Sequence, residues 1–282
     1  MTVGGQFKKR QRNEIKEPMT LCIVNINNKG NVEFWSDSRL NYGDNKPIDM
    51  AVKVVSFPVT IYNISDKWTP DYSQNWGICF AGGGQTIYYI KDFILENLRN
   101  LEYSSDLFDV SANKISNYIS VIYKIAVQKF VDKLSLDDGG CELITTGFCP
   151  KEKRFITYYY TIKFPIDDWD DIEIIVNELV DNIKFIGNGK YVAQNLYDDG
   201  LKNPYQIMKK IIDENLNNKV GGQIQFGENV NLDFKVKGVA KIENHKTITQ
   251  LRGVDLYDVN LFDYTQDLKP TTSFLINLKE IK

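Results

Sequence analysis

The sequence predicts an α+β protein in which two mainly antiparallel sheets pack face to face between layers of helices. Short β-rich apolar segments occur at the start, in the middle and near the end of the chain, each bounded by turn residues. Two pairs of segments with helical periodicity separate these groups of strands. The resulting order of strands, two helices, strands, two helices and strands fits two sheets covered by helices.

The first strands are expected to form a hairpin. Two apolar runs, Leu21-Cys22-Ile23-Val24 and Val32 to Trp35, flank the glycine-containing turn Asn27-Asn28-Lys29-Gly30. The second run leads directly into Ser36-Asp37-Ser38-Arg39. Further strands are predicted at 50–57, 60–64 and 76–81, with Pro58 interrupting the first two.

Helical periodicity then appears in four places. The helix predicted at 84–102 opens at Gly82-Gly83-Gly84, and its apolar side chains are spaced three or four residues apart. The helix at 111–135 has Ser111 as its N-cap. The remaining elements are a hairpin at 141–148 and 154–164, a strand at 183–189, helices at 190–198 and 204–217, and a final hairpin at 223–227 and 231–240.

Composition excludes several classes of protein. The chain has 282 residues, a formal net charge of -3 and a pI of about 5.4, which gives no electrostatic basis for binding nucleic acid. No apolar run approaches the roughly 20 residues that span a membrane, and the start of the chain lacks the apolar core of a secretory signal. Four cysteines without CxxC spacing favour a reducing cytoplasm. We therefore expect no membrane partner and a cytoplasmic location.

We expect no metal and no cofactor. The chain has one histidine, His245, which excludes multi-histidine metal sites. The acidic cluster Asp167 to Asp171 lacks EF-hand spacing and is interpreted as a solvated loop. The turn Gly82 to Gly84 lacks the Lys-Ser/Thr of a P-loop, so close backbone packing explains it better than phosphate binding.

Thr20, Asp37 and Lys53 form a candidate catalytic group, because each lies on an extended segment and β pairing can bring them together. A threonine hydroxyl needs a base, and an N-terminal threonine supplies its own α-amine. A lysine ammonium would lower the pKa of that amine and hydroxyl, and a carboxylate would keep the lysine charged and oriented. The alternative is structural: a β-branched residue that starts a strand, and a turn with a solvated ion pair.

The chain contains the string Ser36-Asp37-Ser38-Arg39-Leu40-Asn41-Tyr42-Gly43, with Thr20 before it and Lys53 ten residues after it. This arrangement resembles the N-terminal-nucleophile (Ntn) hydrolases of the proteasome superfamily. The resemblance is closest to the bacterial proteasome-related peptidases called Anbu, with HslV and the proteasome β-subunits behind them. The segment Gly77 to Gly84 is similar to the family's strand that ends in a small-residue turn before the first long helix.

The resemblance covers about residues 20–240 and implies a four-layer αββα sandwich, the Ntn-hydrolase or proteasome β-subunit fold. It also implies a Thr20 nucleophile, backbone donors to the oxyanion at Gly82 and Gly83, and subunits in a homo-oligomeric ring or spiral that shields the site. A peptide or amide would be the substrate. Ser36 and Arg39, as parts of the matching string, are predicted supporting residues.

The later part of the chain departs from the family's pattern. The family has a Gly-Ser-Gly turn whose serine supports the nucleophile, and here the turn is Gly187-Asn188-Gly189. The family's supporting aspartate and second serine correspond by spacing to Asn217 and Val220. Neutral amides and an isopropyl group should weaken activation of the threonine. Asn188 and Asn217 are still predicted as supporting residues.

The chain divides into a flexible tail or propeptide at 1–19, an Ntn-hydrolase-like domain at 20–240 and a β-rich extension at 241–282. Thr20 follows Met19 in this chain, so its α-amine exists only after the preceding residues are removed, or if translation starts at Met19 and that methionine is then removed. Three functions stay open: a threonine-type Ntn peptidase or amidohydrolase, a catalytically silent scaffold or assembly subunit with Thr20 uncleaved, and a small-ligand binding module.

Overall fold

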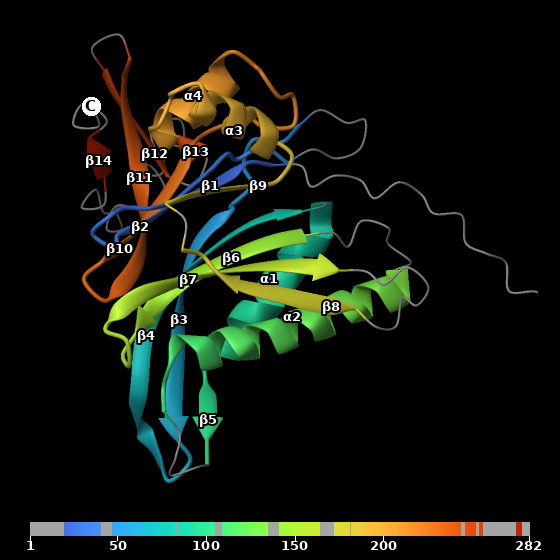
Figure 1. Ribbon diagram of the computed structural model, residues 1–282, viewed down its shortest axis with the longest axis vertical. Coiled ribbons are helices and arrows are strands. Elements are labelled where there is room, and N and C mark those ends of the chain that lie inside the picture. The colour runs from blue at the N-terminus through green and yellow to red at the C-terminus, as the bar shows by residue number, and fades with distance from the viewer. Residues whose placement is uncertain are drawn as a thin grey trace, which may run out of the picture.

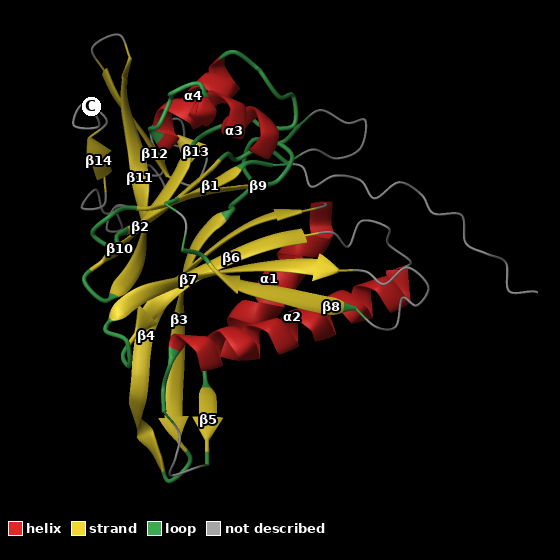
Figure 2. Cartoon of the chain, in the orientation of Figure 1, coloured by secondary structure: helices red, strands yellow, loops and turns green. Residues whose placement is uncertain are grey.

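The computed structural model describes residues 20–40, 47–82, 84–104, 109–134, 141–163, 172–180, 182–243, 246–251, 254–255 and 275–277. Within this part of the chain, four α-helices accompany two curled sheets whose strands are mostly antiparallel (Figures 1 and 2). The predicted α+β class and the two mainly antiparallel sheets are confirmed.

The first sheet carries the start of the described chain. Its strands run in the order β13-β12-β11-β10-β2-β1-β9, and β14 pairs with β11 in parallel. The predicted first hairpin forms here, with Cys22 opposite Ser36. The strands are β1 (Cys22–Ile26), β2 (Val32–Ser36), β9 (Ile183–Ile186), β10 (Gln225–Val230), β11 (Asp233–Glu243), β12 (Lys246–Leu251), β13 (Val254–Asp255) and β14 (Leu275–Asn277).

The second sheet is built around a long hairpin. Its order is β5-β3-β4-β6-β7-β8, and β5 alone pairs in parallel with its neighbour. The β3–β4 hairpin reaches well beyond β6, β7 and β8, and β5 pairs with β3 near its far end (Figure 1). The strands are β3 (Val54–Asn63), β4 (Asp66–Gly82), β5 (Leu101–Tyr103), β6 (Cys141–Cys149), β7 (Arg154–Lys163) and β8 (Glu173–Glu178).

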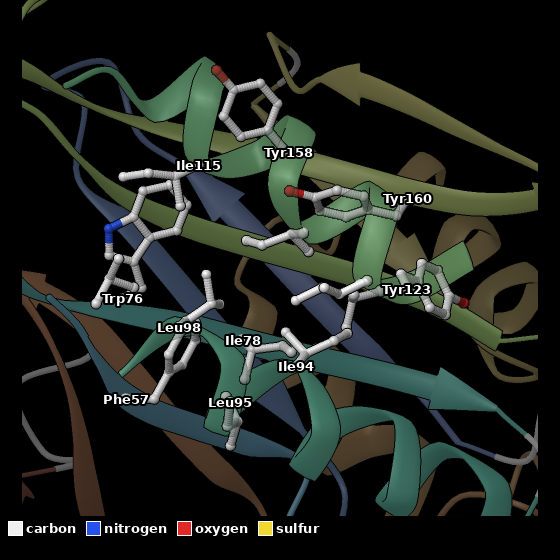
Figure 3. Packing of buried hydrophobic residues seen from close by; sticks show 14 of the residues in the cluster. Phe57, Trp76, Ile78, Ile94, Leu95, Leu98, Ile115, Tyr123, Tyr158 and Tyr160 are labelled. Carbon is white, nitrogen blue, oxygen red and sulfur yellow. The ribbon is translucent and has the colours of Figure 1, made fainter. Parts of the chain in front are cut away.

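Each sheet packs against its own pair of helices. Helices α1 (Gly84–Leu98) and α2 (Ala112–Leu134) lie on the second sheet, where Ile94 and Ile115 join Trp76 and Tyr160 in one apolar cluster (Figure 3). Helices α3 (Lys190–Asp198) and α4 (Pro204–Asp213) lie on the first sheet through a second cluster. The apolar stripes recognised in the sequence are therefore the packed faces of these helices.

A third apolar cluster lies between the two sheets. It joins residues of β1, β2 and β11 to residues of β3, β4 and β6. The rings of Phe34 and Phe234 are 4.9 Å apart in this layer. A Cβ on Gly77 would lie 2.5 Å from the Phe234 ring, so only glycine allows this approach of the sheets. The Cys22 thiol, at the start of β1, donates to the Phe80 carbonyl near the end of β4 at 3.2 Å, close to where the site forms.

The structure corrects several predicted boundaries. Helix α1 ends at Leu98, and the last residues of the predicted helix form β5 instead. Strand β3 continues through Pro58, because the exposed proline lies where β5 does not pair and no ladder donor is needed on that edge. Strand β4 begins at Asp66, ten residues before the predicted start at 76, and α4 ends at Asp213 rather than 217.

The predicted boundary after residue 240 falls inside β11, which ends at Glu243 and pairs with β12. The described strands of the predicted extension therefore continue the first sheet. All four cysteines are buried free thiols. None of the described helices is both long and apolar enough to cross a membrane. The predicted tail at 1–19 and the acidic loop at 167–171 lie outside the described residues.

Candidate active site

The first hairpin places Thr20 beside Asp37. Thr20 precedes β1, Asp37 follows β2, and the register of Cys22 with Ser36 sets the two residues at the same end of the hairpin. The Thr20 hydroxyl donates to Asp37 Oδ1 at 2.6 Å, and the Leu21 amide donates to the same oxygen at 3.0 Å. A short hydrogen bond to a carboxylate is among the stronger kinds in proteins.

Lys53 completes the group from the other sheet, just before β3. Its ammonium donates to Thr20 Oγ1, to Asp37 Oδ1 at 2.9 Å and to the Arg39 carbonyl at 2.5 Å. The side chains are shielded from solvent, since Thr20, Asp37 and Lys53 are 1%, 0% and 3% exposed. The three predicted residues therefore meet as a buried hydroxyl, carboxylate and ammonium in direct contact.

The second carboxylate oxygen of Asp37 also accepts hydrogen bonds. Asp37 Oδ2 accepts from the Arg39 amide at 3.0 Å and from the Gly221 amide at 3.1 Å. Asp37 thus binds five donors that come from four parts of the chain: Thr20 and Leu21, Arg39, Lys53, and Gly221. Buried charges need such compensation, so the carboxylate is the organising group of the site.

The predicted supporting residues Ser36 and Arg39 hold the backbone around the trio. The Ser36 hydroxyl donates to the Leu21 carbonyl at 3.0 Å, next to Thr20. The Arg39 guanidinium binds Asp49 through two hydrogen bonds of 2.9 and 3.1 Å. This bond to Asp49 raises the pKa of Arg39, so the arginine stays charged. Neither side chain contacts the Thr20 hydroxyl; both fix the segments that carry the trio.

The turn between β9 and α3 lies behind Thr20. The Gly189 amide donates to the Thr20 carbonyl at 3.1 Å. Asn188 is held at this turn by Asn217, whose Nδ2 donates to Asn188 Oδ1 at 2.9 Å. Val220 is 1% exposed and packs in the apolar cluster under α3 and α4. An amide pair and an apolar contact therefore occupy the positions where the sequence departs from the expected pattern.

Solved structures of other proteins share the fold of this chain. The chain superimposes on the Anbu complex of Pseudomonas aeruginosa, described as a helical assembly, with a TM-score of 0.52 and 15% identity over 90% of this chain and 99% of that one. Anbu (ancestral beta-subunit) from Yersinia bercovieri gives a TM-score of 0.51 and 14% identity over 89% and 99%. The chain has the fold of the Anbu proteins. No family model and no curated protein matches it.

At this identity the likeness to Anbu is one of fold, and the resemblance recognised in the sequence string is confirmed at that level. The Anbu-like fold places the end of β4 close to Thr20. Gly82 is the last residue of β4 and pairs with Cys141, while Gly83 lies outside the described residues. Ala81 also reaches the turn behind Thr20, since a Cβ on Gly187 would lie 3.0 Å from its Cβ.

Several residues that build the site were not predicted. Gln225 on β10 accepts from the amides of Lys53 and Val54 at 2.9 and 3.2 Å and so fixes the backbone of the lysine. Gly221 donates to Asp37, and a Cβ there would lie 2.2 Å from the Arg39 guanidinium carbon. These contacts join positions more than 170 residues apart, and no local pattern in the sequence marks them.

The charge environment around the trio extends to α1. Burial raises the pKa of the Tyr88 hydroxyl, and the nearby Asp37 and Cys22 raise it further, so this tyrosine stays protonated at neutral pH. Among the described residues, no group of three or more histidine, cysteine, aspartate or glutamate side chains is placed to hold a metal ion. What the described trio can do is hold, orient and polarise one hydroxyl.

Proposed function

We propose that the chain is a threonine-type Ntn peptidase or amidohydrolase, with Thr20 as the nucleophile after removal of residues 1–19. The observation that carries this proposal is the direct contact of the Thr20 hydroxyl with both Asp37 and Lys53 in a buried centre. The Anbu-like fold supports it, since in this chain Thr20 directly precedes the first strand of that fold and Asp37 follows the second. The proposal includes an αββα layer order for the whole domain.

In the proposed reaction, Thr20 Oγ attacks the carbonyl carbon of a peptide or amide, and the α-amine of Thr20 accepts the hydroxyl proton. The Lys53 ammonium stabilises the developing alkoxide, and Asp37 holds the lysine charged and oriented. The backbone at Gly82 and Gly83 donates to the oxyanion. The C–N bond then breaks, and the amine leaves with the proton from the Thr20 ammonium. Water then attacks the remaining ester and gives a proton to the α-amine. The bond from the acyl carbon to Thr20 Oγ breaks, the carboxylic acid leaves, and the α-ammonium returns the proton to Oγ.

The test compares three forms of the full domain on a panel of fluorogenic peptide amides. One form begins at Thr20, freed by a specific protease site placed before it; the second retains residues 1–19; the third carries Thr20→Ala and is processed like the first. We expect hydrolysis only by the first form. A processed chain with no turnover above the Thr20→Ala variant would overturn the proposal.

The second candidate is a catalytically silent scaffold in which Thr20 stays joined to Met19. Asn188, Asn217 and Val220 favour it, because they provide no hydroxyl or carboxylate to the turn behind Thr20. In that case the buried Asp37–Lys53 pair is structural. A full-length chain that assembles, keeps residues 1–19 and gains no activity on engineered cleavage would favour the scaffold.

Other parts of the proposal follow from the sequence. We propose homo-oligomerisation in a ring or spiral, and the helical assembly of the Pseudomonas Anbu complex supports an extended arrangement. We also propose a cytoplasmic location, consistent with four free buried cysteines. No nucleic-acid partner, membrane partner or cofactor is part of the proposal. Sedimentation velocity of the processed chain tests the oligomeric state.

A further inference from the structure

The turn Gly187-Asn188-Gly189 sets the position of the Thr20 carbonyl. The Gly189 amide donates to that carbonyl at 3.1 Å, and a Cβ on Gly187 would lie only 2.3 Å from its oxygen. Gly187 has a φ of +90°, which glycine adopts without strain. Because the turn touches Thr20 directly, a displacement of the turn moves the backbone that carries the hydroxyl.

A carboxylate from the other sheet holds this turn. The Gly187 amide donates to Glu142 Oε2 at 2.7 Å, and Glu142 lies on β6 opposite Ala81. The Tyr159 hydroxyl donates to Glu142 Oε1 at 2.5 Å. Lys190 Nζ, at the start of α3, lies 3.6 Å from Oε1. The Glu142 side chain is only 14% exposed, so these hydrogen bonds are largely shielded from water.

Tyr159 is suited to keep Glu142 in place. Burial raises the pKa of its hydroxyl, and the hydrogen bond to Glu142 raises it further, so the tyrosine remains a donor at neutral pH. The Lys184 ammonium lies 4.7 Å from the centre of the Tyr159 ring, which adds a cation–π contact on the same side chain. Tyr159, on β7, therefore holds the Glu142 side chain in the position where it accepts from the Gly187 amide.

We infer that Glu142 is a positioning residue that acts through the Gly187–Gly189 turn on Thr20. The inference rests on the proposed function, since it concerns how the nucleophile is aligned. Its geometric basis is three hydrogen bonds joined through the backbone of the turn: Tyr159 and the Gly187 amide both donate to Glu142, and the Gly189 amide, two residues on, donates to the Thr20 carbonyl. The path joins the second sheet to the nucleophile's backbone without touching Asp37 or Lys53.

Substitution of Glu142 distinguishes an effect on the alignment of Thr20 from an effect on substrate binding. Glu142→Ala removes the acceptor, and a displacement of about 1 Å can cost roughly 100-fold in rate, so we expect kcat to fall about 100-fold with KM changed less than about threefold. Glu142→Gln keeps one oxygen for the Gly187 amide, and its NH2 can donate to the Tyr159 oxygen. That variant should recover much of the lost kcat.

The matched control is Glu178, a carboxylate on β8 that pairs with Arg154 at 2.9 Å at the surface. Glu178→Ala should leave kcat and KM unchanged. An unchanged kcat in Glu142→Ala, or an increase in KM without loss of kcat, would overturn the inference. Thermal unfolding of each variant checks that the fold is retained, and Glu142→Gln supplies the comparison if the alanine variant does not fold.

A second readout does not need hydrolysis. In the full chain, amide hydrogen exchange at Gly187 and at Gly189 should both accelerate at least about tenfold in Glu142→Ala, because the second amide loses alignment with the Thr20 carbonyl. Acceleration at Gly187 alone would contradict the inference and leave Glu142 as a local anchor. If the processed wild-type chain hydrolyses nothing, the proposed function fails, and exchange at Gly189 still decides the positioning claim.

Discussion

Replacing Asp37 with asparagine perturbs the centre of the buried site with little change of shape. One carboxylate oxygen becomes an NH2 group, which donates and does not accept. In the native chain, Oδ1 accepts three hydrogen bonds and Oδ2 accepts two. Whichever way the amide is oriented, its NH2 group therefore faces at least two donors that have lost their acceptor.

The magnitude follows from these contacts. Each buried donor left without a partner costs about 1–3 kcal/mol. Removing one member of a buried ion pair costs about 3–5 kcal/mol, and Lys53 Nζ, 2.9 Å from Asp37 Oδ1, would lose its counter-charge. The two contributions overlap, because Lys53 is itself one of the donors. We expect Asp37→Asn to lower the free energy of unfolding by about 4 kcal/mol.

Urea unfolding followed by tryptophan fluorescence measures this loss. The control is Asp49→Asn, which alters an ion pair with Arg39 at 2.9 Å in which the aspartate side chain is 39% exposed. A pair of this exposure contributes less than about 1 kcal/mol, so the control should unfold near the native midpoint. If Asp37→Asn is within about 1 kcal/mol of the native chain, the assignment of five donors to this carboxylate is wrong.

Three further predictions concern the same structure. Lys53→Met should lower kcat by about 10²–10³-fold, because the ammonium in contact with Thr20 Oγ1 is lost; steady-state assays of the processed chain test this, and unchanged activity would refute the mechanism. Asn217→Ala removes the hydrogen bond to Asn188 Oδ1 and should lower kcat about tenfold with little change in stability, as kinetics and thermal unfolding would show. Burial raises the pKa of Tyr160, so the folded state keeps a proton that the unfolded chain releases near pH ~10. Stability should therefore fall above pH ~10, and less steeply in Tyr160→Phe, as unfolding curves at several pH values would show.

Much of the fold could be predicted because local patterns mark it. The first hairpin follows from two apolar runs around Asn27–Gly30, and the start of α4 follows from Pro204 at its first turn. The structure adds Asn203 as the N-cap, and the Asn203 side chain accepts from the Gln206 amide. The early part of β4 was missed because its alternation is polar and Pro70 interrupts it. Whether such a segment forms a strand depends on the strand that it pairs with. The early part of β4 is extended because it pairs with β3, and its own composition does not predict this.

The candidate site likewise has residues that the sequence predicts and residues that it does not. Thr20, Asp37 and Lys53 lie within one continuous stretch, so a hydroxyl, a carboxylate and an ammonium on neighbouring strands could be recognised from the sequence. Gln225 and Glu142 could not, because their partners are set by the packing of two sheets that are distant in sequence. Chemistry carried by one short stretch of the chain is visible in a sequence, whereas the groups that align it depend on tertiary contacts.

The central claim is that Thr20 becomes a free N-terminal nucleophile. The most direct measurement is the intact mass of the chain after incubation with a threonine-directed epoxyketone, with Thr20→Ala as the control. The proposed function predicts a chain that begins at Thr20 and carries one probe molecule, together with an unmodified control. A chain that keeps residues 1–19 and carries no probe, or a control that is labelled equally, would contradict it.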